Sequence, residues 1–102
     1  MPYALRHTAT GTLLSGVQRN GYKLAYYGLI FWESPPEPAQ IAEALAEARI
    51  APDDPAGRIA DWEALELTEH EAKMANVKLR NDPRRVAFYR DGAIGASGLH
   101  ST

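Results

Sequence analysis

Residues Tyr22 to Trp32 read YKLAYYGLIFW and form the most apolar and aromatic stretch of the chain. They follow an Asn20-Gly21 dipeptide and end before Pro35 and Pro36, where a strand cannot continue. Near the end of the stretch both alternating faces are apolar, and such a strand favours a neighbour on each side and cover on both faces. The pattern therefore predicts the central strand of a sheet.

Two weaker strands are expected before this stretch, over residues 3–8 and 12–18, because their residues alternate in polarity. Thr10-Gly11 separates them, and Asn20-Gly21 matches a type I′ turn, which suits paired antiparallel strands. These signals predict an N-terminal three-stranded meander. Gly28 lies inside the last strand, where a missing side chain indicates a bulge or the close approach of another element.

Two helices are predicted after the meander. Residues 39–50 are strong helix formers with one apolar stripe, Pro38 suits the first helical position, and Ala51-Pro52 ends the helix. Thr68 and Glu71 form a capping box, in which each residue's side chain accepts a hydrogen bond from the other's backbone N–H. A second helix is therefore expected from residue 69 to about residue 80.

The segment 58–67 fits either a strand or a helix, and we favour a short edge strand through Leu65 and Leu67. Residues 84–90 and 93–98 flank Asp91-Gly92 and predict a closing hairpin. The fold class expected is α+β over a single domain, residues 1–102. It comprises an antiparallel sheet of about five strands, made of the N-terminal meander and the C-terminal hairpin, with two helices on one face.

Composition excludes several classes of protein. The chain has no cysteine, so disulfides, thiolate metal sites and cysteine nucleophiles are ruled out. Its longest strongly apolar run, Leu24 to Trp32, is shorter than the roughly 18 residues of a membrane span. The first residues contain no apolar segment of signal-peptide length. We therefore expect a soluble, cytoplasmic protein.

The net charge of −2 conceals an uneven distribution. Residues 1–32 carry three cationic side chains and no acid, residues 33–72 carry eleven acids against two arginines, and residues 73–102 carry six cations against two acids. Because the acidic middle contains the first predicted helix and the basic ends contain the hairpins, the sequence predicts a cationic sheet surface under an anionic helical cover.

No catalytic or metal-binding pattern is complete. His70 and Glu71 begin a zinc-protease signature, but Met74 stands where the second histidine is required. His70 is therefore expected to be a partly buried or helix-end residue. Gly92 to Gly98 is rich in glycine but opens no helix. We predict a protein that is not an enzyme and uses no cofactor or metal, with a small hydrolase-like enzyme as the least favoured alternative.

The charge distribution gives the main functional hypothesis. Aromatic and basic side chains together on a sheet are typical of contact surfaces, where tyrosine and arginine contribute much of the binding energy. We predict a small binding or assembly module whose protein partner, or second copy, is contacted by Lys23, Tyr27, Arg84, Arg85, Tyr89 and Arg90. Binding of single-stranded nucleic acid through the same surface is the alternative. No membrane contact is expected.

Overall fold

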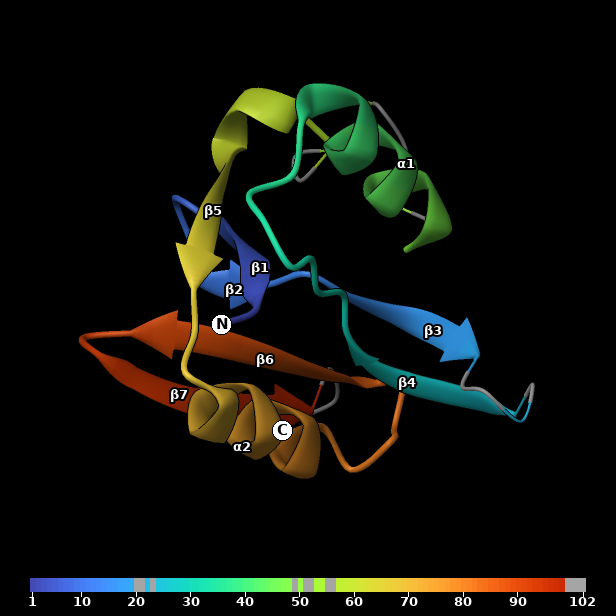
Figure 1. Ribbon diagram of the computed structural model, residues 1–102, viewed down its shortest axis with the longest axis vertical. Coiled ribbons are helices and arrows are strands. Elements are labelled where there is room, and N and C mark those ends of the chain that lie inside the picture. Colours follow the sequence, from blue (N-terminus) through green and yellow to red (C-terminus); the bar gives the residue numbers. More distant parts are fainter. Residues whose placement is uncertain (20–21, 23, 49, 51–52, 55–56, 99–102) are drawn as a thin grey trace.

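The computed structural model describes residues 1–19, 22, 24–48, 50, 53, 54 and 57–98, and it confirms an α+β fold with a five-stranded antiparallel sheet (Figure 1). The strands of this sheet lie in the order β5-β1-β2-β6-β7, and β3 and β4 form a second, two-stranded sheet. The elements are β1 (Tyr3–His7), β2 (Thr12–Leu13), β3 (Ser15–Arg19), β4 (Ala25–Leu29), α1 (Pro38–Glu47), a 3-10 turn (Ile59–Asp61), β5 (Trp62–Glu66), α2 (Glu69–Leu79), β6 (Arg85–Arg90) and β7 (Ala93–Gly98).

The predicted three-stranded meander does not form, because the chain changes sheets at Leu14. The Leu14 N–H donates to the carbonyl of Leu5 in β1, at 2.9 Å, whereas the Leu14 carbonyl accepts from the N–H of Ile30, at 3.1 Å. The two residues before Leu14 therefore stay with β1 and β6, and the residues after it pair with β4. One predicted strand becomes two, each in its own sheet.

The stretch from Tyr22 to Trp32 is not the central strand that its composition predicts. Only Ala25–Leu29 forms β4, and β4 pairs with β3 alone. Leu29 and Ile30 are buried, but Tyr22 is 87% exposed and Leu24 is 64% exposed. The apolar residues at the start of the stretch lie on a hairpin that extends past the core, whereas those at its end enter the core (Figure 1).

The helices lie on opposite sides of β1 and not on one face of the sheet as expected. Successive residues of a strand point to opposite faces. Ala4 packs in the core that contains the buried residues of α2, and the next residue, Leu5, packs in the core that contains those of α1. Leu13 and Leu14 divide in the same way. The protein therefore has two cores, one under each helix, separated by β1 (Figure 1).

Several local predictions are confirmed. Segment 62–66 is the edge strand β5, and Thr68 and Glu71 form the capping box that begins α2. Asp91 and Gly92 turn the β6–β7 hairpin with φ of 53° and 77°. Helix α1 starts at Pro38 but ends at Glu47, before the predicted end at residue 50. The predicted breaker Ala51-Pro52 and the turn Asn20-Gly21 lie outside the described residues.

Charge is not sorted by layer as predicted. Strand β5 brings Glu63 and Glu66 into the sheet, and Glu63 forms an ion pair with Arg6 of β1 at 2.9 Å. Lys78 lies in the last turn of α2, as the sequence predicts, but the helix also carries Lys73 among its acids. The edge strand was the ambiguous segment of the sequence, and its glutamates place negative charge beside the cations of the sheet.

Candidate functional site

The residues predicted as a contact surface fall into two groups at opposite ends of β6. At its start, Tyr27 of β4 is half-buried, and its hydroxyl donates to the carbonyl of Arg85 at 2.9 Å. Arg84 stands next to Arg85 and pairs with Asp82 at 3.1 Å. Tyr27, Arg84 and Arg85 are thus brought together, while Lys23 lies outside the described residues.

Tyr89 and Arg90 lie at the other end of β6, four to five residues from Arg85, or roughly 13–17 Å along an extended strand. The Arg90 guanidinium lies 4.3 Å from the centre of the Phe88 ring, and its Nε donates to the carbonyl of Thr10. The predicted surface is therefore not one compact patch. The role of these residues in binding stays a prediction.

The cation of Arg84 is engaged within the chain. Its guanidinium donates to both carboxylate oxygens of Asp82, at 3.1 and 3.2 Å. These hydrogen bonds, with the positive charge itself, hold the pKa of Asp82 below its ordinary value and raise that of Arg84. Arg6 is engaged likewise, by Glu63 and by the Tyr89 carbonyl. Internal partners thus compete with any ligand for these charges.

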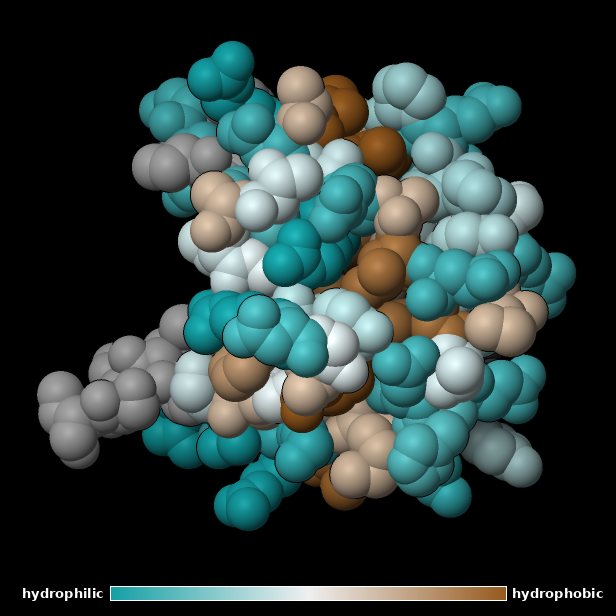
Figure 2. Space-filling model, turned by 90° about the vertical axis from the view of Figure 1, so that its left-hand side faces the viewer, coloured by the Kyte–Doolittle hydropathy of each residue, from teal (hydrophilic) through white to brown (hydrophobic). Residues whose placement is uncertain are grey.

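A different surface stands out in the structure: the hairpin of β3 and β4. Seven large apolar side chains are exposed in the described part of the chain, and four of them, Val17, Tyr22, Leu24 and Tyr26, belong to this hairpin. The hairpin projects to one side of the molecule (Figure 1). On the face at the other end, hydrophobic residues show along a seam and in small patches among hydrophilic ones (Figure 2).

Sequence patterning missed this surface for a physical reason. Alternating or continuous apolar residues indicate a strand that can be buried, but they do not specify whether another element covers it. Leu24 and Leu29 have the same residue type, yet the first is 64% exposed and the second 1%. The predicted turn at Asn20-Gly21 was the available signal in the sequence, because residues next to a hairpin turn are expected to lie farthest from the rest of the sheet.

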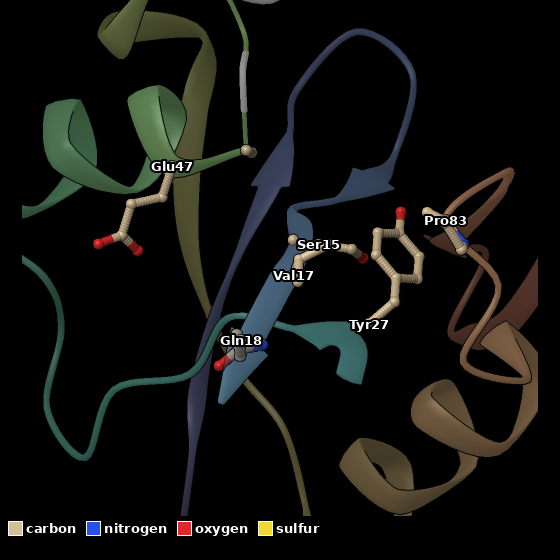
Figure 3. Close-up of a pocket in the computed structure, with 8 residues that line it drawn as sticks. Ser15, Val17, Gln18, Tyr27, Glu47 and Pro83 are labelled. Carbon is tan, nitrogen blue, oxygen red and sulfur yellow. The ribbon is translucent and has the colours of Figure 1, made fainter. Parts of the chain in front are cut away.

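A cavity of about 940 Å³ lies along β3 (Figure 3). We call it the edge groove. Four successive residues of β3, from Ser15 to Gln18, line it, together with the end of α1 and with Tyr27 and Pro83. Because successive strand residues point to opposite faces, a cavity lined by four of them runs along the edge of the strand. Its volume is near the upper end of the roughly 300–1,000 Å³ of ligand pockets.

The backbone of β3 faces the edge groove with groups that β4 does not use. Ile30 N–H donates to the Leu14 carbonyl, so Leu14, Gly16 and Gln18 are the residues whose backbone groups point toward β4. Val17 lies between them and turns its N–H and C=O away from β4. Among the described residues none is hydrogen-bonded to these two groups of Val17.

The outer edge of β4 is covered by two asparagine side chains. Asn76 of α2 accepts a hydrogen bond from the N–H of Leu29, at 2.9 Å, and Asn81 accepts one from the N–H of Tyr27. A β-carbon on Gly28 would lie 2.8 Å from the Asn76 Oδ1 atom. The predicted close approach at Gly28 is therefore confirmed, and α2 is the element that approaches.

Tyr27 offers a spectroscopic probe of the groove. Burial raises the pKa of its phenol above the ordinary value of 10.0. A hydrogen bond with the Ser15 side chain lowers this pKa in part, and the charge of Asp82 raises it further. The Ser15 and Tyr27 side chains point toward one another (Figure 3). Because the folded pKa is raised, the stability that the neutral phenol contributes is complete below pH 10 and is lost as pH rises through the folded pKa.

The wild type and Tyr27→Phe can each be titrated with alkali while the absorbance of the phenolate band is recorded. The difference between the two curves reports the ionisation of Tyr27, and we expect its midpoint to lie above pH 10. Circular dichroism over the same range serves as the control that both proteins remain folded. A difference curve with its midpoint at pH 10 or lower contradicts the burial of this phenol.

The two histidines that the structure describes, His7 and His70, lie in different environments. His70 is exposed in the first turn of α2, which confirms a helix-end position. His7 is buried against Trp62 with ring centres 5.1 Å apart, and its Nε2 atom has no hydrogen-bond partner in the described structure. No three histidine, aspartate or glutamate residues that the structure describes are grouped to hold a metal ion.

Comparison with known proteins found no family model, no curated protein and no solved structure that matches this chain. Among the helices that the structure describes, none is long and apolar enough to cross a membrane. The edge groove and the β3–β4 hairpin are therefore the features that bear on function.

Proposed function

We propose that this protein is a small, non-enzymatic binding or assembly module whose β3–β4 hairpin contacts another protein chain. The observation that carries the proposal is the concentration of exposed apolar side chains on this one hairpin. Burying apolar surface stabilises a complex by roughly 25 cal/mol for each Å² removed from water. Val17, Leu24, Tyr22 and Tyr26 each supply such surface on the hairpin, with Val17 and Tyr26 on opposite faces of the two strands. Tyrosine is among the residues that dominate interface energies.

The proposal retains protein contact and Tyr27 from the sequence-based hypothesis, and it adds the hairpin. Binding of single-stranded nucleic acid is the less favoured function, because a phosphate backbone needs cations that are available to it. Arg6 and Arg84 already pair with carboxylates, and Arg90 already contacts Thr10 and Phe88. An oligonucleotide bound at low ionic strength and released by salt is the result expected for that alternative.

Site-specific photo-crosslinking tests the proposal. A benzophenone amino acid placed at Tyr26 is expected to form discrete protein adducts when the protein is expressed in its natural cells, since this side chain would lie in the contact. The same amino acid at Ile59 is the matched control, because Ile59 is 38% exposed and Tyr26 is 36% exposed. Equal labelling at both positions, or adducts with nucleic acid alone, overturns the proposal.

A further inference from the structure

We propose that a second cavity, between residues 31–33 and the first turn of α2, binds an organic cation: an ammonium group with an apolar body. The volume of this cavity is about 610 Å³, within the roughly 300–1,000 Å³ of ligand pockets. We call it the α2 pocket. Its lining comes from the first two residues of the chain, from Phe31, Trp32 and Glu33, and from Glu69 and Ala72 of α2. None of these residues belongs to the β3–β4 hairpin, so the proposal does not depend on the proposed function.

Backbone hydrogen bonds fix the walls of the α2 pocket. The N–H of Trp32 donates to the carbonyl of Tyr3 in β1, at 3.0 Å, and the Trp32 carbonyl accepts from the N–H of Tyr3, at 2.8 Å. The carbonyl of Pro2 accepts from the N–H of Leu67, at 2.9 Å. Helix α2 supplies the remaining wall, and its first turn is fixed by the capping box. The pocket is therefore preformed, so binding does not require the chain to become ordered.

The α2 pocket offers apolar surface to the body of such a ligand. Phe31 and Trp32 are both half-buried, and Phe31 packs against the core under α2 whereas Trp32 packs against the core under α1. The ring on the α2 side is therefore that of Phe31, and the buried Ala72 lies in the same core. Positive charges are attracted to the faces of aromatic rings. Phe31 can thus contact both the apolar body and the charge of an organic cation.

Two carboxylates give the α2 pocket its charge. Glu33 and Glu69 are both exposed and both line the pocket, and the described lining contains no lysine or arginine. Neither carboxylate forms an ion pair with a described cation, the amino group of Met1 included. Lys73 follows Glu69 by one turn on α2 and makes no ion pair with it in the described structure. Unlike the paired carboxylates of Glu63 and Asp82, these two are therefore available to a ligand.

The dipole of α2 does not reverse this charge. A helix N-terminus carries roughly half of an elementary positive charge. Glu69 and Glu71 in the first turn of α2 exceed it, and Glu33 adds a further negative charge from the segment 31–33. The α2 pocket therefore repels phosphate and carboxylate ligands and attracts cations.

A metal ion is not the cation that the α2 pocket fits. Among the described residues no three histidine, aspartate or glutamate side chains are grouped to hold one. A metal ion would also leave the ring of Phe31 and the apolar surface of Ala72 unused. An ammonium group with an apolar body matches the carboxylates and the apolar surface together.

Titration of the full chain with choline, followed by amide NMR spectra, tests the proposal. We expect the amide resonances of Phe31, Glu33 and Ala72 to shift, with a dissociation constant in the millimolar range or below. The matched probe is the neutral carbon analogue of choline, in which a tert-butyl group replaces the trimethylammonium group. We expect this analogue to bind at least about tenfold more weakly, because it keeps the shape and loses the charge. A peptide with one trimethyllysine is the second probe: tighter binding than choline assigns the group to a protein partner, and weaker binding assigns it to a free small molecule.

Charge-removing variants complete the test. Glu33→Gln and Glu69→Gln are each expected to weaken choline binding about fivefold, because each removes one carboxylate from the pocket. Glu43→Gln is the matched control, since Glu43 is an exposed glutamate of α1 outside the pocket, and it is expected to leave the affinity unchanged. Circular dichroism checks that the variants fold. If Glu69→Gln does not fold, Glu33→Gln decides, because Glu33 lies outside the helices and strands.

Three results overturn the proposal. One is the absence of shifts at the pocket resonances with choline at millimolar concentration. Another is equal affinity for choline and its neutral analogue, which would make the site merely apolar. The third is an affinity for choline that Glu33→Gln and Glu69→Gln change no more than Glu43→Gln does.

Discussion

Leu79→Ala is expected to lower the free energy of unfolding by about 2–5 kcal/mol. Leu79 has no exposed surface and packs in the core under α2 with Leu13, Leu29 and Leu67. Truncation removes buried methyl groups and leaves a cavity that a sheet held by backbone hydrogen bonds closes only in part. Domains of this size have only about 5–15 kcal/mol of stability in total, so the effect is a large fraction of it.

Val77→Ala is the control for this prediction. It lies on the same helix, is 58% exposed and is expected to change stability by less than about 0.5 kcal/mol. Urea unfolding followed by tryptophan fluorescence and circular dichroism measures both variants. A loss below about 1 kcal/mol for Leu79→Ala would show that this residue is not enclosed as the structure describes.

Gly28→Ala and Asn76→Ala are each expected to lower the free energy of unfolding by about 1–3 kcal/mol. The loss in the double variant is expected to be smaller than the sum of the two single losses. Alanine at position 28 would place its β-carbon 2.8 Å from Asn76 Oδ1 and displace the amide that accepts the Leu29 N–H. Removing the Asn76 side chain leaves the same N–H without its acceptor. In a strand, glycine to alanine is otherwise favourable, so the sign of the effect is itself informative.

A double-mutant cycle measures the coupling. Once Asn76 is alanine, the Gly28→Ala change meets no amide, and we expect it to be nearly neutral, which gives an interaction energy of about 0.5–3 kcal/mol. Lys73→Ala, on an exposed position of α2, controls for the helix propensity of alanine. Additive losses of stability would mean that the Asn76 side chain does not accept a hydrogen bond from β4.

The features that could be predicted from the sequence depend on neighbouring residues. The capping box of Thr68 and Glu71 and the Asp91-Gly92 turn act within a few residues, so local chemistry determines them. The strand at 62–66 was correctly favoured over a helix. The glycine at position 28 correctly indicated a close approach, although its partner could not be identified, since Asn76 is 48 residues away in the sequence.

The features that were missed depend on long-range pairing. The change of sheet at Leu14 requires β1 on one side and Ile30 on the other, and neither partner is encoded near residue 14. Helix α2 covers Ala4 and helix α1 covers Leu5, and this places the helices on opposite sides of β1. Because both residues are apolar, their sequence does not indicate which helix covers which residue. The open edge of β3 was missed for the same reason, because the number of neighbours of a strand is a property of the whole sheet.

Placing adjacent residues in different cores has a consequence for cooperativity. Three pairs of adjacent residues each contribute one side chain to one core and one to the other: Ala4 and Leu5, Leu13 and Leu14, and Leu29 and Ile30. Displacement of any of these short backbone segments disturbs the packing beneath both helices at once. We therefore expect that neither half of the molecule unfolds while the other stays intact, and that the domain unfolds as one unit although it has two cores.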